Sequence, residues 1–156
     1  MPSIEENFAH LGIVLPAPPK PVASYVPFVR TGNLVFISGQ LPSRDSQVLF
    51  RGKVPVPIGV EQAQEAARLA LINALAVLGD ACGGRWDRFV RIVRLGVFVQ
   101  CEPDFDRQSV VANGASDLLA ALFGAAGRHA RAAVGSNALP LGSAVEVELL
   151  AEICDG

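Results

Sequence analysis

Residues 131–152 read RAAVGSNALPLGSAVEVELLAE, and the second half of this stretch alternates between apolar and polar side chains. Successive side chains of a β-strand point to opposite faces of its sheet. A strand over residues 144–153 would therefore turn one apolar face to the core and leave Glu146, Glu148, Leu150 and Glu152 on the other. Because Leu150 belongs to that second face, we do not expect the face to be wholly exposed to water.

Arg131 stands near the start of the preceding predicted strand, residues 129–136, among apolar neighbours. Because a guanidinium cannot be neutralised by losing its proton, it needs an anionic or carbonyl partner. A substrate carboxylate would be such a partner, since two parallel hydrogen bonds fix its orientation as well as its charge. The alternative that the sequence leaves open is a structural ion pair with Glu146 or Glu148 on the neighbouring strand.

The remaining segments predict the other elements of the fold. Alternating residues and turn residues indicate strands over residues 22–29, 34–40, 48–54 and 91–101. Apolar residues at helical spacing predict long helices over residues 60–78 and 104–123. Two helices can cover only one side of a sheet of about six strands. We therefore expect an α+β fold with both long helices on one face of a mixed sheet.

The first 21 residues predict a short helix and an extended arm. Ser3 and Glu6 have the spacing of a capping box, in which each side chain binds the backbone N–H of the other, so a helix should run from about residue 4 to 11. The proline-rich residues 15–21 then favour an extended chain, because proline cannot donate a backbone hydrogen bond. Because the sequence shows no linker of the kind that separates domains, residues 1–156 are expected to form a single domain.

The composition predicts a protein that associates with copies of itself. Apolar residues make up 51% of the chain and charged residues only 18%, which suggests more apolar surface than one small domain can hide. Subunits should pack on the sheet face that the helices leave open. The apolar residues expected there are Leu34, Phe36, Phe98 and Leu150.

Charge and cysteine usage argue against several classes of protein. The formal net charge is −2 and the 13 lysines and arginines are scattered, which does not favour nucleic-acid binding. The longest apolar run, residues 69–78, is too short to cross a membrane. The three cysteines and two histidines lack metal-site or disulfide spacing, and no signal peptide is apparent. We expect a cytoplasmic protein without metal or cofactor.

Three separated blocks of the sequence resemble one known family. They are residues 25–42, YVPFVRTGNLVFISGQLP; the Val-rich strand containing residues 97–99; and Arg131 followed by Leu139-Pro and by residues 145–148, VEVE. In this order and spacing the chain resembles the RidA/YjgF family, also called the endoribonuclease L-PSP family, over roughly residues 22–153. The resemblance implies a chorismate-mutase-like α+β fold and a homotrimer with a small-molecule site in each cleft between subunits.

The resemblance also implies an activity. The best-studied members hydrolyse enamines and imines of the 2-aminoacrylate and 2-iminopropanoate type to 2-keto acids and ammonia. By resemblance, Arg131 would hold the substrate carboxylate and Glu146 would lie near the attacking water. Tyr25, Gly39 and Asn113 would lie at or near other substrate-binding positions of the cleft.

Each of these candidates also has a structural explanation. Glu146 could be a solvated strand residue, and Tyr25 could simply pack beside the hairpin. Gly39 could mark a bulge in its strand. Asn113 is followed by Gly114, so the pair could form a helix kink instead of contacting a ligand.

Departures from the family pattern keep a second function open. The N-terminal arm is longer, Ala23-Ser24 replaces the usual Gly-Pro before the tyrosine, and Ala133 stands where several members have cysteine. A trimeric module that binds a small carboxylate metabolite without turnover is therefore the alternative to a deaminase. Cleavage of RNA fits poorly, because basic and aromatic residues do not cluster as an RNA groove requires.

Overall fold

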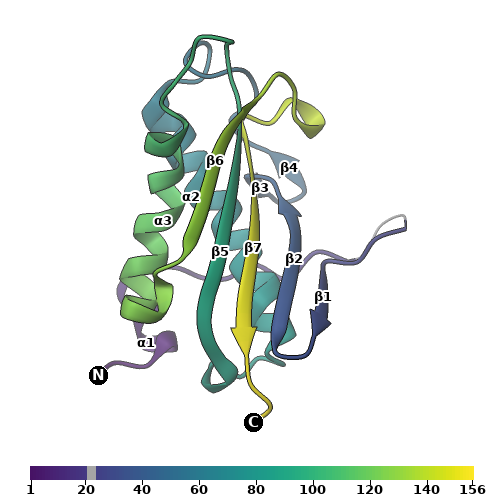
Figure 1. The fold of residues 1–156 in the computed structure, drawn as a ribbon, viewed down its shortest axis with the longest axis vertical. Coiled ribbons are helices and arrows are strands. Elements are labelled where there is room, and N and C mark those ends of the chain that lie inside the picture. The colour runs from purple at the N-terminus through teal and green to yellow at the C-terminus, as the bar shows by residue number, and fades with distance from the viewer. Residues whose placement is uncertain (21–23) are drawn as a thin grey trace.

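Five strands form the main sheet of the protein, and Figure 1 shows both long helices on one side of it. The computed structural model describes residues 1–20 and 24–156. Among the described residues the strand order is β1-β2-β7-β5-β6, in which the pair β5–β6 is parallel and the other pairs are antiparallel. The strands are β1 Phe28–Thr31, β2 Leu34–Gln40, β5 Phe89–Gln100, β6 Ala130–Ser136 and β7 Val145–Ile153.

The two long helices, α2 Val60–Ala81 and α3 Gln108–Phe123, pack against each other and cover one sheet face. Buried alanines on α2 keep its surface shallow, so the backbone of α3 can approach closely. At Gly114 the carbonyl group of Gln64 already fills the space that a Cβ would need. Three short 3-10 turns complete the helical segments of the described residues: η1 Trp86–Arg88, η2 Gly124–Gly127 and η3 Pro140–Gly142.

The alternation predicted for the last strand is confirmed. Along β7 the odd-numbered residues from Val145 to Ile153 are buried, and the even-numbered residues between them are half-buried. Neighbouring β2 follows the same rule, because Val35 and Ile37 are buried whereas Phe36 between them is 46% exposed. The sheet face opposite the helices, called the open face below, therefore carries apolar side chains that no described residue covers.

The strand predicted over residues 48–54 is wrong as a member of the main sheet. Val48 belongs to β4, Gln47–Val48, which pairs with β3, Ser43–Arg44, in a separate two-stranded sheet. Beyond it the chain makes only single bridges, from Arg51 and Val54. Phe50 and Gly52 have φ angles of 57° and 129°, so the segment leaves the extended conformation that a ladder needs. The main sheet therefore has five strands instead of about six.

The N-terminal predictions are largely confirmed. In α1, Ile4–His10, Ser3 N–H donates to Glu6 Oε2 at 2.7 Å and Glu6 N–H donates to Ser3 Oγ at 3.1 Å, which completes the capping box. The strand predicted over residues 22–29 is wrong at residues 24–27, since β1 runs from Phe28 to Thr31 and Tyr25 precedes it. The predicted arm residue 21 and strand residues 22 and 23 lie outside the described residues.

Residues Gln108–Gly127 are long and apolar enough to meet the length and hydropathy criteria for a membrane-crossing helix. In this fold the same residues form α3 and η2, and α3 buries six of its residues between α2 and the sheet. Leu122 at the end of α3 also accepts a hydrogen bond from Asn7 Nδ2 at 2.8 Å. We therefore interpret α3 as a core helix.

Replacing Gly114 by alanine should destabilise the protein, because the added methyl group would collide with the backbone of Gln64. Overpacking of this kind costs about 1–3 kcal/mol. Helix propensity alone predicts the opposite effect, a gain in stability of roughly 0.5–1 kcal/mol. Urea denaturation of the wild type and the variant at one protomer concentration measures the difference in stability. A Gly114→Ala variant more stable than the wild type would contradict the close contact between the helices.

Candidate functional site: two clusters on opposite sheet faces

Arg131 lies on the helix-covered side of the sheet, at its edge strand. It is the second residue of β6 and pairs with Leu95 of β5, whose side chain is fully buried beneath the helices. Paired residues of neighbouring strands share a face. Because β6 is the last strand on its side of the sheet, the guanidinium reaches the surface, and Arg131 is exposed.

Two side chains of α3 hold the Arg131 guanidinium. Its Nη1 donates to Asn113 Oδ1 at 2.8 Å and to Ser116 Oγ at 3.1 Å. Asn113 and Ser116 are three residues apart and therefore lie on one face of the helix. The kink interpretation of Asn113-Gly114 is wrong, since α3 is continuous and Gly114 is explained by its contact with α2.

His129 extends this set of hydrogen bonds. Its Nδ1 lies 2.6 Å from the carbonyl oxygen of Gly127, which can only accept, so Nδ1 carries a proton and donates to this oxygen. Its Nε2 lies 3.0 Å from Ser116 Oγ, within hydrogen-bond distance. We call Arg131, Asn113, Ser116 and His129 the arginine cluster. The sequence does not single out Ser116, although its spacing from Asn113 is a signal that could have found it.

The ion pair considered for Arg131 is not formed. Glu148 instead accepts from Arg94 Nη1 at 2.9 Å on the open face. Among the described residues, the Nε and Nη2 groups of Arg131 have no hydrogen-bond partner. These two nitrogens are the pair that a carboxylate engages with two parallel hydrogen bonds. The arrangement therefore leaves an anchored guanidinium with a free edge.

Tyr25, Gly39 and Glu146 form a second group, called the glutamate cluster. Tyr25 and Gly39 line one hollow of about 230 Å³. A Cβ on Gly39 would overlap Oε1 of Glu146, so the missing side chain makes room for this carboxylate. The pairing of β2 with β7 also shifts register between Ile37 and Gln40, in keeping with a bulge at Gly39. Both structural explanations of Gly39, close approach and bulge, thus apply.

Glu146 is partly withdrawn from water and lies near another carboxylate. Burial raises the pKa of Glu146 above its ordinary value, and the charge of nearby Glu148 raises it further. Among the described residues no side chain donates a hydrogen bond to it, whereas Glu148 is paired with Arg94. Glu146 is therefore the less stabilised anion of the two, a property suited to accepting a proton.

The arginine cluster and the glutamate cluster do not meet within one chain. Glu146 pairs with Phe98 of β5, and Arg131 pairs with Leu95 of the same strand. Leu95 and Phe98 are three positions apart on one strand, so their side chains lie on opposite faces of the sheet. One chain thus carries the two clusters on different faces of its sheet.

The described residues include no group of three or more His, Cys, Asp or Glu that could hold a metal ion. Cys82 and Cys101 are buried and Cys154 is half-buried. Burial raises the pKa of the Cys82 thiol to about 11, so this thiol is not activated as a nucleophile.

A family model described as "YjgF/chorismate_mutase-like, putative endoribonuclease" matches residues 5–153. The chain belongs to the YjgF family. Protein TCP17 of Trypanosoma cruzi is 43% identical over 151 residues, covering 96% of this chain and 94% of that protein. YjgF membership confirms the chorismate-mutase-like α+β fold that the sequence resemblance implied.

Two solved structures resemble this YjgF chain over nearly its whole length. Atu1372 of Agrobacterium tumefaciens, a protein of unknown function, is 41% identical with a TM-score of 0.90, covering 97% of this chain and 92% of that one. A "putative endoribonuclease" of Shewanella oneidensis is 32% identical with a TM-score of 0.92, covering 97% and 100%. Both relatives therefore share the fold over 97% of this chain.

The Glu146 carboxyl should titrate at a higher pH than an ordinary glutamate, and Glu148→Gln should lower its pKa, because one of the two causes of the upward shift is removed. The carboxyl carbon shift of Glu146, followed by NMR against pH, measures this. Glu152→Gln, on the same strand face, is the matched control and should change the pKa little. An unshifted Glu146 would contradict the environment described here.

Proposed function

We propose that this protein is a hydrolytic deaminase of small enamine and imine acids of the 2-aminoacrylate and 2-iminopropanoate type, giving a 2-keto acid and ammonia. The carrying observation is the Arg131 guanidinium, which Asn113 and Ser116 hold while Nε and Nη2 stay free for a carboxylate. The substrate class follows from the sequence resemblance to the RidA/YjgF family.

The chemistry needs a positioned water and a proton acceptor. Water adds to the electrophilic C=N carbon of the protonated imine, and the resulting carbinolamine loses ammonia as the C=O bond forms. A carboxylate that is poorly stabilised as an anion can take the proton of the attacking water and pass it to the leaving nitrogen. Glu146 has this character, and Tyr25 can donate a hydrogen bond to the substrate.

The site would be completed between two copies of the chain. Since the two clusters lie on opposite faces of one sheet, the arginine cluster of one copy has to meet the glutamate cluster of another. The open face supports such packing, because a hollow of about 370 Å³ there is lined by Val29, Phe36 and Leu150 beside the Arg94–Glu148 pair. We propose a homotrimer with three such sites.

A trimeric module that binds a small carboxylate without turnover is the second candidate. One observation favours it: Ala133 puts a methyl group where several family members carry a thiol, beside an arginine that can bind a carboxylate by itself. This candidate predicts saturable binding of pyruvate and no acceleration of imine hydrolysis.

The decisive assay supplies 2-aminoacrylate freshly generated by a serine dehydratase and follows pyruvate formation beyond the rate in buffer. Arg131→Ala should lower kcat/KM by about 100-fold, the order expected for a charged, two-point contact. Arg128→Ala, three residues away, is the control and should keep most of the activity. Each variant should elute from a sizing column as the wild-type assembly does, and an active Arg131→Ala would refute the proposal.

Ser116→Ala should raise KM by about two- to tenfold with a smaller change in kcat, because one of the two hydrogen bonds that orient Arg131 is lost. Ser116→Thr keeps the hydroxyl and should restore KM. Steady-state kinetics of the two variants side by side tests this. A Ser116→Ala enzyme with unchanged KM would show that Asn113 alone orients the guanidinium.

A further inference from the structure

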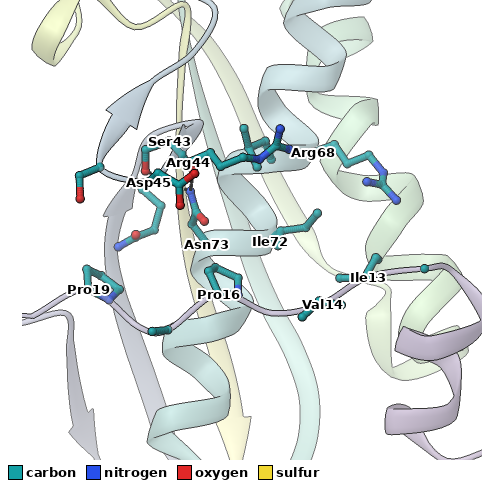
Figure 2. Close-up of a pocket in the computed structure, with 15 residues that line it drawn as sticks. Ile13, Val14, Pro16, Pro19, Ser43, Arg44, Asp45, Arg68, Ile72 and Asn73 are labelled. Atoms are coloured by element: carbon teal, nitrogen blue, oxygen red, sulfur yellow. Dashed lines mark hydrogen bonds between the residues drawn. The ribbon is translucent and has the colours of Figure 1, made fainter.

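The proline-rich arm encloses a hollow that the proposed reaction does not use. After α1 the chain crosses α2 on the side away from the sheet, as Figures 1 and 2 show from different directions. Between the arm, α2 and the β3–β4 hairpin lies a hollow of about 640 Å³. Its volume falls within the range of small-molecule sites, roughly 300–1,000 Å³. Neither Arg131 nor Glu146 lines it.

The chain is anchored just before it reaches the hollow. Phe8 is buried against Trp86, with ring centroids 5.2 Å apart, and Asn7 Nδ2 donates to the Leu122 carbonyl at 2.8 Å. Ile13 is also buried. From there the arm passes in front of α2 in Figure 2, with Val14 and Pro16 on the arm and Ile72 on the helix. Both sides of this gap are apolar.

Positive charge gathers at the upper rim of the hollow in Figure 2. Arg44 of β3 and Arg68 of α2 both line it, and neither makes an ion pair or a side-chain hydrogen bond with a described residue. Asp45 of the hairpin turn lines it too and is likewise without an ion-pair partner among the described residues. Two cations and one anion leave the rim with a net positive charge, which favours an anionic ligand.

A buried amide adds a polar contact beside this rim. Asn73 is only 8% exposed, and its Nδ2 donates to the carbonyl oxygens of Leu41 at 2.9 Å and Ser43 at 3.0 Å. These two acceptors fix which end of the amide is the oxygen. Among the described residues no group donates to that oxygen, so it is free to accept from a ligand or its bound water.

From these features we propose that the hollow under the arm is a second ligand site, which takes a small acid with an apolar body. The apolar part lies between Val14, Pro16 and Ile72, and the acid group is bound by Arg44 and Arg68. The site is separate from the one that Arg131 serves, because it is built from the arm, α2 and the β3–β4 hairpin instead of α3 and β6. It gives the arm a role in ligand binding.

Sodium octanoate is a suitable probe, because it joins one carboxylate to a short apolar chain. Added to the isotope-labelled full chain at up to about 10 mM, above the millimolar Kd of a weak site, it should shift the backbone NMR signals of residues 43–46 and 72–73 saturably. Octanol, the neutral analogue, should bind at least about tenfold more weakly if the arginines bind the acid group.

Paired variants separate this site from the proposed active site. Arg44→Gln with Arg68→Gln should weaken octanoate binding at least about tenfold and leave 2-aminoacrylate hydrolysis unchanged. Arg131→Gln should lower 2-aminoacrylate hydrolysis and leave octanoate binding unchanged. Arg85 is a surface arginine just before η1, and Arg85→Gln should change neither octanoate binding nor hydrolysis. Three results would overturn the proposal. Octanoate could shift only signals near Arg131 or on the open face, its shifts could fail to saturate, or it could bind the double variant as tightly as the wild type.

Discussion

The contact between the backbones of α2 and α3 sets the geometry on which the candidate site depends. With no side chain at Gly114, α3 rests on the carbonyl group of Gln64. A larger residue would push α3 away from α2 and displace the residues beside Gly114 in sequence. Asn113 is one of them, and it holds Arg131 together with Ser116. Close helix packing in the core thus fixes the position of a charged group at the sheet edge.

The sheet serves two purposes on its two faces. The face under the helices supplies the core, and the open face carries carboxylates among exposed apolar side chains. Arg131 escapes burial on the first face only because β6 is an edge strand. The same strand periodicity that builds the core therefore separates the arginine cluster from the glutamate cluster, which is why the function proposed above needs two copies of the chain for one site.

Much of this arrangement could be predicted from local sequence. Alternation along residues 144–153 predicts β7, the Ser3–Glu6 spacing predicts the cap of α1, and helical spacing predicts α2 and α3, because each pattern reports a period of regular structure. The prediction of a strand over residues 48–54 is wrong because an apolar run does not reveal the positive φ angles of Phe50 and Gly52.

The candidate site was only partly predictable, for a different reason. Arg131 and Asn113 do lie together. Ser116 and His129 take their place through contacts between α3 and the approach to β6, which no single-segment pattern contains. That Arg131 and Glu146 face opposite ways depends on the register of β5 against both neighbours, a property of three strands at once.

The pairing of β2 with β7 has a consequence for how the chain acquires its structure. Leu34 pairs with Glu152, so the inner edge of the β1–β2 hairpin is without its partner until nearly the whole described chain has been synthesised. An unpaired strand edge is a template for association with other chains, and such long-range pairing slows folding. Until β7 has been made, the nascent hairpin therefore exposes a strand edge to which other chains can bind.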